Sequence, residues 1–595
     1  MSIVETRTLN EATRFDPIMI SIVRSLLVAI MDECEINLSR TALSPLIYEG
    51  KDYCIGLLNR DADTIVQSRG SVPTFMSDLG VPVRDALDIY GEDGIHPGDV
   101  FMMNYAEICG QHLNNMVLYA PVHYEGKLVG FMATRAHWTD VGGKTPGSVS
   151  TNATEIFQEG IQFRTVKIYK RGERCEEILR MLRHNTRYPD LVIGDMEAQI
   201  AAVELGVRRY LALIEKYSWD VIEYCITDLW QRSEQLARAR VRAIPNGRYT
   251  AEAFLDDDGI DPDTIIPLKV TVIIEDDTFT VDYSDFPPQT KGPMNSGGNV
   301  AESIARVAFK SAICPEGPAT EGTFRPVKVI IPDRTLLSAR DNAPMSLWTV
   351  SIKTIVDMIY KALSQAMPDA VPAAHHGSMG VYSFSGYNPK TGREFSTADT
   401  VLGGWGARPN GDGFSPLKTV THGDTKQVSA EVEEVLFPLV IESHEWLPDS
   451  AGPGEYRGGL GLKKIYRLPL GARFVGAFER AKCPPWGLFG GGSAVPGKIM
   501  VQQPGETSWT RFQKVTALEI KPGGRVALYS GGGGGRGYAF NRPVEKVRED
   551  VRLGYVTAEG AERDYGVSLS GSDLIVDEAK TSRLRDEMRA RMTSE

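Results

Sequence analysis

Apolar residues recur at helical spacing through long stretches of the first 245 residues. Asp16-Pro17 is typical of an N-cap followed by a first helical turn, and apolar side chains follow it every three or four positions. The same spacing predicts three long helical segments, the second of them broken near Tyr188-Pro189: 16–40, 174–218 and 219–243. Between the first two, apolar runs of strand length predict β-structure.

Two of those runs predict a β-hairpin. Residues 117–122 and 128–133 are short apolar stretches, and Glu125-Gly126-Lys127 between them is a turn sequence. In an antiparallel pair, the residue before the first strand lies beside the residue after the second strand. The two ends of this hairpin are therefore expected to meet.

From Gly247 onward the pattern changes. Strands are predicted at 249–254, 268–274 and 278–284, and helices at 299–314 and 348–367. After about residue 371 the chain is glycine-rich, with short apolar strands between the glycine clusters. We predict an α+β fold with four parts: a mixed α/β N-terminal domain (1–245), an α+β middle domain (246–370), a glycine-rich β domain (371–570) and a charged C-terminal helix (571–595).

Composition narrows the class of protein. The 595 residues are 42% hydrophobic and 24% charged, with a net charge of −12, which is typical of a soluble globular protein and argues against nucleic-acid binding. No apolar run reaches the roughly 18 residues of a membrane span, and Met1–Glu5 lacks the features of a signal peptide. Seven scattered cysteines without a C-x-x-C spacing indicate reduced thiols, and we expect a cytoplasmic location.

The histidines give the best indication of chemistry. Four of the nine lie between residues 96 and 137. His112 precedes the first strand of the predicted hairpin and His137 follows the second, so both rings are expected to face one space; His123 falls at the opposite, turn end. Asn115 and Asp140, each three residues further on, offer oxygens, and this set suits Zn, Mn or Fe with an open position. The alternative is that both imidazoles merely bond to loop backbone.

Three other candidates are weaker. Glu49 and Asp52 lead into the apolar strand 54–58, where a carboxylate can act as a base, although turn residues are commoner there. Cys109 lies three residues before His112 and could be a nucleophile, but nothing indicates a depressed thiol pKa. His375-His376 could join a site or simply end a strand, and we favour the latter.

The glycine run from Ser530 to Gly537 does not have the pattern of a nucleotide-binding loop. Arg536 stands where a P-loop has lysine, and Gly537 where it has a hydroxyl residue. We therefore interpret the run as a turn that lets backbones pack closely, and we expect no ATP site in this chain alone.

Several blocks together resemble the hydantoinase B/oxoprolinase family, which includes N-methylhydantoinase B, caprolactamase B, the C-terminal half of 5-oxoprolinase, and components of acetone and acetophenone carboxylases. The resemblance extends from Asp16 to about Leu569. The blocks that carry it are 40–45, 135–143, 155–160, Gly194-Asp195 with Gln199, 403–409, 449–452 with 457–459, and 554–556 with 563–567.

The resemblance implies a division of labour. A separate A-type ATP-binding subunit, with ATP and magnesium, phosphorylates an amide or enol oxygen, and the B-type subunit takes the activated substrate onward. In hydrolases water attacks the activated lactam, hydantoin or imide; in carboxylases a phosphorylated enol reacts with CO2. The family's metal pattern, His-x-x-Asp with a second His, falls on His112, Asn115 and His137, and we expect a hetero-oligomer.

Two departures from the family pattern affect the mechanism. Asn115 stands where an aspartate is expected, and a neutral amide is a weaker metal ligand. Ser71 and Phe75 stand where hydrolases of the family commonly have two histidines. Our leading hypothesis is an ATP-dependent cyclic-amide hydrolase in which His112 and His137 hold a divalent ion or act on water, Asp140 orients His137 or the water, and Asp52 assists. A ketone carboxylase subunit and a non-catalytic scaffold subunit remain as alternatives.

Overall fold

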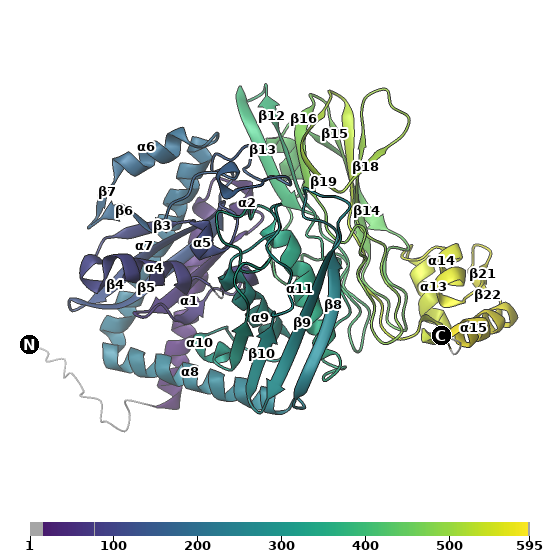
Figure 1. The fold of residues 1–595 in the computed structure, drawn as a ribbon, viewed down its shortest axis with the longest axis horizontal. Coiled ribbons are helices and arrows are strands. Elements are labelled where there is room, and N and C mark those ends of the chain that lie inside the picture. Colours follow the sequence, from purple (N-terminus) through teal and green to yellow (C-terminus); the bar gives the residue numbers. More distant parts are fainter. Residues whose placement is uncertain (1–15, 77, 593–595) are drawn as a thin grey trace, which may run out of the picture.

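The described residues fold into helices and five sheets that together form an α+β structure, as predicted (Figure 1). A computed structural model describes residues 16–76 and 78–592, so Met1–Glu5 lies outside the described residues. None of the described helices has the length and apolar character needed to cross a membrane.

The N-terminal part is built on a seven-stranded antiparallel sheet. Its strands are, in spatial order, β2 (Thr64–Gln67), β1 (Tyr53–Asn59), β5 (Lys127–His137), β4 (Asn115–Tyr124), β3 (Val100–Met103), β6 (Val166–Lys170) and β7 (Glu173–Arg174). The hairpin β4–β5 is confirmed. Glu125 and Gly126 adopt positive φ in its turn, at 49° and 77°, which suits a tight two-residue connection.

Long helices pack on one face of this sheet. The helix α1 (Pro17–Thr41) begins where Asp16 accepts a hydrogen bond from the backbone N–H of Ile18 at 3.0 Å, as an N-cap does. It packs against α7 (Pro189–Tyr217), which contacts β4 and β5. The predicted break at Tyr188-Pro189 is real, because α6 (Glu176–His184) ends before α7 begins, and α8 (Trp219–Arg242) follows. The remaining short helices of this part are α2 (Pro45–Tyr48), α3 (Pro73–Met76), α4 (Gly80–Tyr90) and α5 (Ala106–Cys109).

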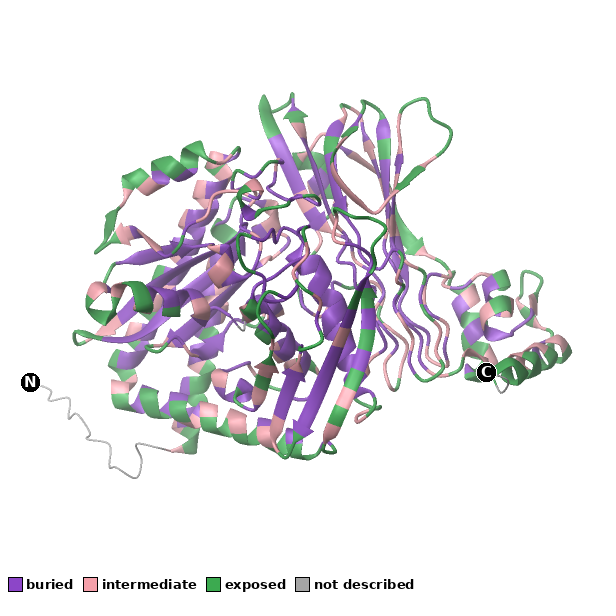
Figure 2. Ribbon diagram, in the orientation of Figure 1, coloured by how far each residue is buried: buried purple, intermediate pink, exposed green. Residues whose placement is uncertain are grey.

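The middle part contributes a second sheet and a buried helix. The sheet has the order β11 (Val327–Ile330), β10 (Thr278–Asp282), β9 (Ile266–Glu275) and β8 (Gly247–Leu255), with α9 (Gly298–Ala312), α10 (Glu321–Phe324) and α11 (Trp348–Leu363). Almost every residue of α11 is buried (Figure 2). One apolar core includes residues of α11, of the middle sheet and of the N-terminal sheet. The division into domains at 245/246 stays a prediction, and the core extends across that point.

The C-terminal part combines two sheets with extended glycine-rich backbone. The first sheet has the order β13 (Arg393–Thr400), β12 (Val381–Asn388), β16 (Ala472–Ala477) and β19 (Lys514–Ile520). The second has the order β14 (Val440–Leu447), β15 (Gly461–Leu468), β20 (Gly524–Tyr529), β17 (Lys498–Gln502) and β18 (Thr510–Phe512). A Cβ at Gly533 would lie 2.0 Å from the carbonyl oxygen of Trp405. Only glycine permits that approach, so the run 530–537 is a backbone-packing segment.

The last residues form a small helical unit beside the rest of the molecule (Figure 1). It consists of α13 (Val544–Arg552), α14 (Ala558–Tyr565), the short pair β21 (Leu569–Ser570) and β22 (Ile575–Val576), and α15 (Glu578–Met592), the predicted charged helix. Another short helix, α12 (Ala430–Leu436), precedes β14.

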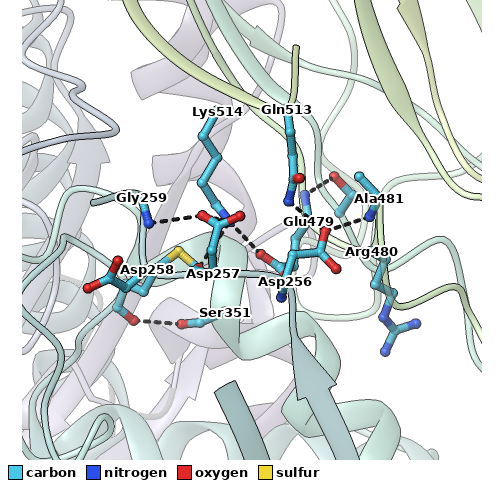
Figure 3. Close-up of polar contacts among 12 residues, drawn as sticks. Asp256, Asp257, Asp258, Gly259, Ser351, Glu479, Arg480, Ala481, Gln513 and Lys514 are labelled. Carbon is cyan, nitrogen blue, oxygen red and sulfur yellow. Dashed lines mark hydrogen bonds and ion pairs between the residues drawn. The ribbon is translucent and has the colours of Figure 1, made fainter. Parts of the chain in front are cut away.

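A buried charged cluster joins the middle and C-terminal sheets (Figure 3). Lys514 Nζ lies 2.9 Å from Asp257 Oδ1 and 3.0 Å from Glu479 Oε2. Asp256, just after β8, accepts hydrogen bonds from the backbone N–H groups of Ala481 and Cys483 at 2.6 and 2.9 Å. Burial raises the pKa of Glu479 to about 7, and the charge of Lys514 opposes that rise.

Candidate functional site

The hairpin brings His112 and His137 together, as the sequence predicted. Asn115 at the start of β4 pairs with His137 at the end of β5, and His112 lies in the turn just before β4. The two imidazole centroids are 4.8 Å apart, with ring planes inclined by 47°. The backbone N–H of His137 donates to the carbonyl oxygen of Asp52 at 3.1 Å, which places Asp52 beside the pair.

These residues line one small cavity. Its free volume is about 40 Å³, room for about three water molecules. Trp348 at the start of α11 presents its ring perpendicular to that of His112, with centroids 5.8 Å apart. The lining residues are Leu46, Asp52, Phe75, His112, Asn115, His137, Val149, Ser346, Trp348, Thr349, Met379, Val381, Ala398, Asp399, Thr400 and His422.

Burial determines the protonation of the two imidazoles. It lowers the pKa of His112 to about 3, helped by the charge that His137 would carry, and it lowers the pKa of His137 to about 4. Both rings are therefore neutral at pH 7, and each has a nitrogen lone pair available for a proton or a metal ion. Burial also raises the pKa of Asp52 to about 6, although the charge of His112 opposes this.

The cavity offers nitrogen and oxygen atoms of the kinds that bind divalent metal ions. Among the described residues, Nδ1 of His137, Oδ1 of Asn115 and Oδ1 of Asp52 are buried without hydrogen-bond partners, and Asn115 uses its amide nitrogen to donate to Gln111 at 2.8 Å. However, no three His, Cys, Asp or Glu side chains in the described part of the chain are grouped so as to hold a metal ion. An ion here would therefore need the weaker amide oxygen of Asn115 as a ligand.

Asp140 does not contact the imidazole pair, contrary to the predicted orienting role. It is fully buried, and Oδ1 accepts hydrogen bonds from Arg187 Nη1 at 2.9 Å and from the backbone N–H of Gly147 at 3.0 Å. Oδ2 accepts from the backbone N–H of Arg187 at 2.9 Å. The Asp140 carboxylate thus accepts hydrogen bonds from the loop that follows β5 and from Arg187, and these bonds hold that loop in place.

The other candidates lie outside the cavity. Glu49 is not one of the lining residues. The thiol of Cys109 is buried, which raises its pKa to about 12, so it is protonated at neutral pH. His375 and His376 lie in the irregular segment before β12, where Nδ1 of His375 is 2.6 Å from Asp357 Oδ1.

The two positions that depart from the family pattern have different surroundings. Phe75 lines the cavity and stacks on Trp348 with centroids 6.5 Å apart. Ser71 is buried outside the cavity lining, and its hydroxyl accepts a hydrogen bond from the backbone N–H of Ile55 at 3.3 Å. The cavity therefore has an aromatic side chain where a histidine would add a polar group.

Sequence reasoning missed two buried polar residues, His422 and Lys353. His422 lines the cavity, and its Nδ1 is 2.8 Å from Lys353 Nζ on α11. No motif surrounds His422, and it lies far from the hairpin in sequence. Lys353 did leave a signal, since it is a charged residue amid the apolar positions of the predicted helix 348–367.

A small hollow, called the neck below, shares lining residues both with the cavity and with a surface cleft. The cavity shares Leu46, Ala398 and Asp399 with a narrow neck of about 20 Å³. The neck in turn shares Pro45, Thr139, Ser396 and Phe437 with an open cleft of about 730 Å³, a volume typical of small-molecule sites.

Comparison with known proteins agrees with this architecture. The profile described as Hydantoinase B/oxoprolinase matches residues 16–539. The chain belongs to the hydantoinase B/oxoprolinase family. A Pseudomonas sp. (strain NS671) protein, provisionally named as the B component of a D-/L-hydantoinase, is 31% identical over 97% of this chain and 99% of its own length. The beta component of caprolactamase from Pseudomonas jessenii is 30% identical over 95% of this chain and 98% of its own length.

Two solved structures share the fold. The crystal structure of ATP-dependent caprolactamase from Pseudomonas jessenii superposes with a TM-score of 0.90 and 28% identity, covering 96% of this chain and 100% of that one. A nucleotide-free acetone carboxylase structure superposes with a TM-score of 0.89 over 99% of this chain and 85% of that one, and at 19% identity it shows the fold alone.

Proposed function

We propose that this chain is the B-type subunit of an ATP-dependent cyclic-amide hydrolase, acting on a lactam or hydantoin that a separate A-type subunit phosphorylates with ATP and magnesium. Full-length similarity to the B component of a hydantoinase and to the beta component of caprolactamase supports this proposal. The observation that carries it is the convergence of His112 and His137, 4.8 Å apart, in a small cavity that Asp52 also lines.

The cavity residues can supply base catalysis. An amide carbonyl is a poor electrophile because of resonance, and transfer of a phosphoryl group to its oxygen makes the ring carbon easier for water to attack. Hydrolysis then breaks the ring C–N bond and releases the phosphoryl group as inorganic phosphate. A neutral His112 or His137 accepts the proton of that water at pH 7, since each neutral ring keeps one nitrogen lone pair free to take it. Asp52, with its free Oδ1, holds the water in line.

We also propose that His112, Asn115 and His137 are the positions that would bind a divalent Zn, Mn or Fe ion. Such an ion would lower the pKa of a water molecule bound to it. The chain's own part is to hold both imidazoles neutral and to keep bulk water out of the cavity. Metal analysis of the purified complex, with His112→Ala as a comparison, tests this assignment without an activity assay.

The decisive experiment uses His137→Ala, co-purified with the A-type partner. We expect ATP turnover to continue while ring-opened product falls by at least about 100-fold, because a positioned base contributes about 10²–10⁴ in rate. His123→Ala is the matched control, because His123 lies at the other end of β4, outside the cavity. Product formation that is unchanged in His137→Ala would end the proposal.

The same assay separates the alternatives. Phe75 puts an aromatic side chain where hydrolases of the family have histidine, which is the observation that favours a ketone carboxylase subunit. Incorporation of labelled bicarbonate into product would establish that activity instead. A complex in which both His112→Ala and His137→Ala keep full activity would indicate a scaffold subunit.

A further inference from the structure

Lys353 is a buried lysine without a carboxylate partner. Its side chain is fully buried in the middle of α11, and no ion pair involves it among the described residues. Its side-chain nitrogen instead contacts the hydroxyl of Thr421 and Nδ1 of His422. An amine in such a place costs free energy, so its presence needs a reason beyond packing.

The reason lies in the ring that Lys353 contacts. Nζ is 2.8 Å from Nδ1 of His422, and His422 is only 4% exposed. A lysine that donates to Nδ1 leaves the proton of the neutral imidazole on Nε2. Because His422 lines the cavity of His112 and His137, its second nitrogen is the one available to a ligand there.

We propose that Lys353 is a positioning residue that fixes the tautomer of His422, and that the Nε2–H of His422 donates a hydrogen bond to the oxygen of the activated substrate that gains negative charge in the transition state. This inference deepens the proposed function and rests on it for the identity of the ligand. It assigns unlike roles to the three cavity imidazoles: His112 and His137 act on water, and His422 binds the oxygen.

The surroundings of Lys353 indicate that its amine donates a hydrogen bond to His422 and does not accept one from it. Burial lowers the pKa of Lys353 well below its ordinary value, and the charge of Asp52, which lies beside His137 in the same cavity, opposes that shift. Thr421 and His422 both offer acceptor atoms to Nζ. A lysine with two acceptors and a nearby carboxylate is arranged to donate.

The kinetic test uses the complex with its A-type partner. We expect His422→Leu to lower kcat by about 100-fold with little change in KM, because a donor to a developing negative charge acts mainly in the transition state. His422→Gln keeps an N–H donor, and we expect it to retain kcat within about tenfold of the wild type. His444→Gln, at an exposed position of β14 outside the cavity, is the matched control. Unchanged kcat in His422→Leu would overturn the inference.

The Lys353→Met variant separates positioning from packing. Methionine has a similar shape and removes an amine that has no ion-pair partner, so the melting temperature is expected not to fall. The value of kcat is expected to fall several-fold, because the imidazole proton is then free to move between the two nitrogens. A loss of stability with an unchanged kcat would overturn the positioning role.

A second measurement needs no substrate. With only nine histidines in the chain, long-range ¹H–¹⁵N spectra of ring-labelled protein can resolve His422, and His422→Gln assigns its signals. We expect an unprotonated Nδ1 and a protonated Nε2, changing to a mixture of tautomers in Lys353→Met. Protonated Nδ1 in the wild type would refute the inference. The expected tautomer without amide hydrolysis would instead count against the proposed function.

Discussion

Glu159 illustrates how burial sets the charge of a residue beside the cavity. Its Oε1 accepts hydrogen bonds from the backbone N–H groups of Met345 and Ser346, both at 2.8 Å. The carbonyl oxygen of Ser346 is in turn 3.4 Å from Nδ1 of His112. Burial raises the pKa of Glu159 to about 8, against the effect of these two donors. The residue therefore positions a cavity segment while it carries a proton at neutral pH.

This pKa predicts a pH dependence of stability. Between pH 4.5, the ordinary value, and about 8, the folded protein holds a proton on Glu159 that the unfolded chain has released. The free energy of unfolding should therefore fall as pH rises through this window, by up to about 1.4 kcal/mol per pH unit from this group. In Glu159→Gln the amide is always neutral, so the variant should be more stable than the wild type at pH 8.5. Urea unfolding of the wild type and of Glu159→Gln at pH 5 and 8.5 measures the change in unfolding free energy with pH. The same change in both proteins would contradict the prediction.

At the scale of elements, the approach to the cavity is built from pieces far apart in the chain. The short helix α2 contributes Pro45 and Leu46, β13 contributes Ser396 and Ala398, and Phe437 follows α12. The carboxylate of Asp195 on α7 accepts hydrogen bonds from the backbone N–H groups just before α2, at 2.8 and 3.0 Å. The neck is thus held on one side by a long helix and on the other by a sheet.

A side chain that fills the neck should slow the reaction without unfolding the protein. Ala398 lines both the neck and the cavity, and Ala398→Leu adds three carbons there. If substrate enters by this route, we expect kcat/KM to fall by about tenfold or more. Ala472→Leu is the matched control, since it fills a different cleft beside the same sheet. Equal kinetic effects of the two substitutions would show that the route lies elsewhere.

At the scale of the whole molecule, the charged cluster around Lys514 connects the middle and C-terminal sheets. Its lysine and both carboxylate partners, Asp257 and Glu479, are nearly fully buried. Removing one member of a buried ion pair leaves an uncompensated charge, which typically costs about 3–5 kcal/mol. The cluster therefore couples the two sheets more strongly than its few contacts suggest.

We expect Lys514→Met to lower the free energy of unfolding by about 3–5 kcal/mol. Lys463→Met on β15, where the lysine pairs with Glu445 at the surface, is the control and should cost about 1 kcal/mol or less. Thermal and urea unfolding of both variants measure the difference. Similar losses in the two variants would mean that the cluster has no special part in joining the sheets.

Local patterns in the sequence determined several helices, the central hairpin and the meeting of two histidines. Helix α1, the break before α7 and the hairpin β4–β5 all follow from spacing, capping and turn residues, which act between near neighbours. The meeting of His112 and His137 followed as well, because strand pairing alone brings the ends of a hairpin together. The family also followed from ordered blocks of residues, and the matching profile confirms it.

Only the tertiary structure decided which distant residues complete the cavity. His422 lines it, and Lys353 contacts His422 through the packing of α11 against a loop about 70 residues further on; no local pattern encodes such a contact. The role of Asp140 was misjudged for the same reason, because Arg187, 47 residues away, takes its carboxylate. Protonation, too, depends on burial, and burial is a property of the folded whole.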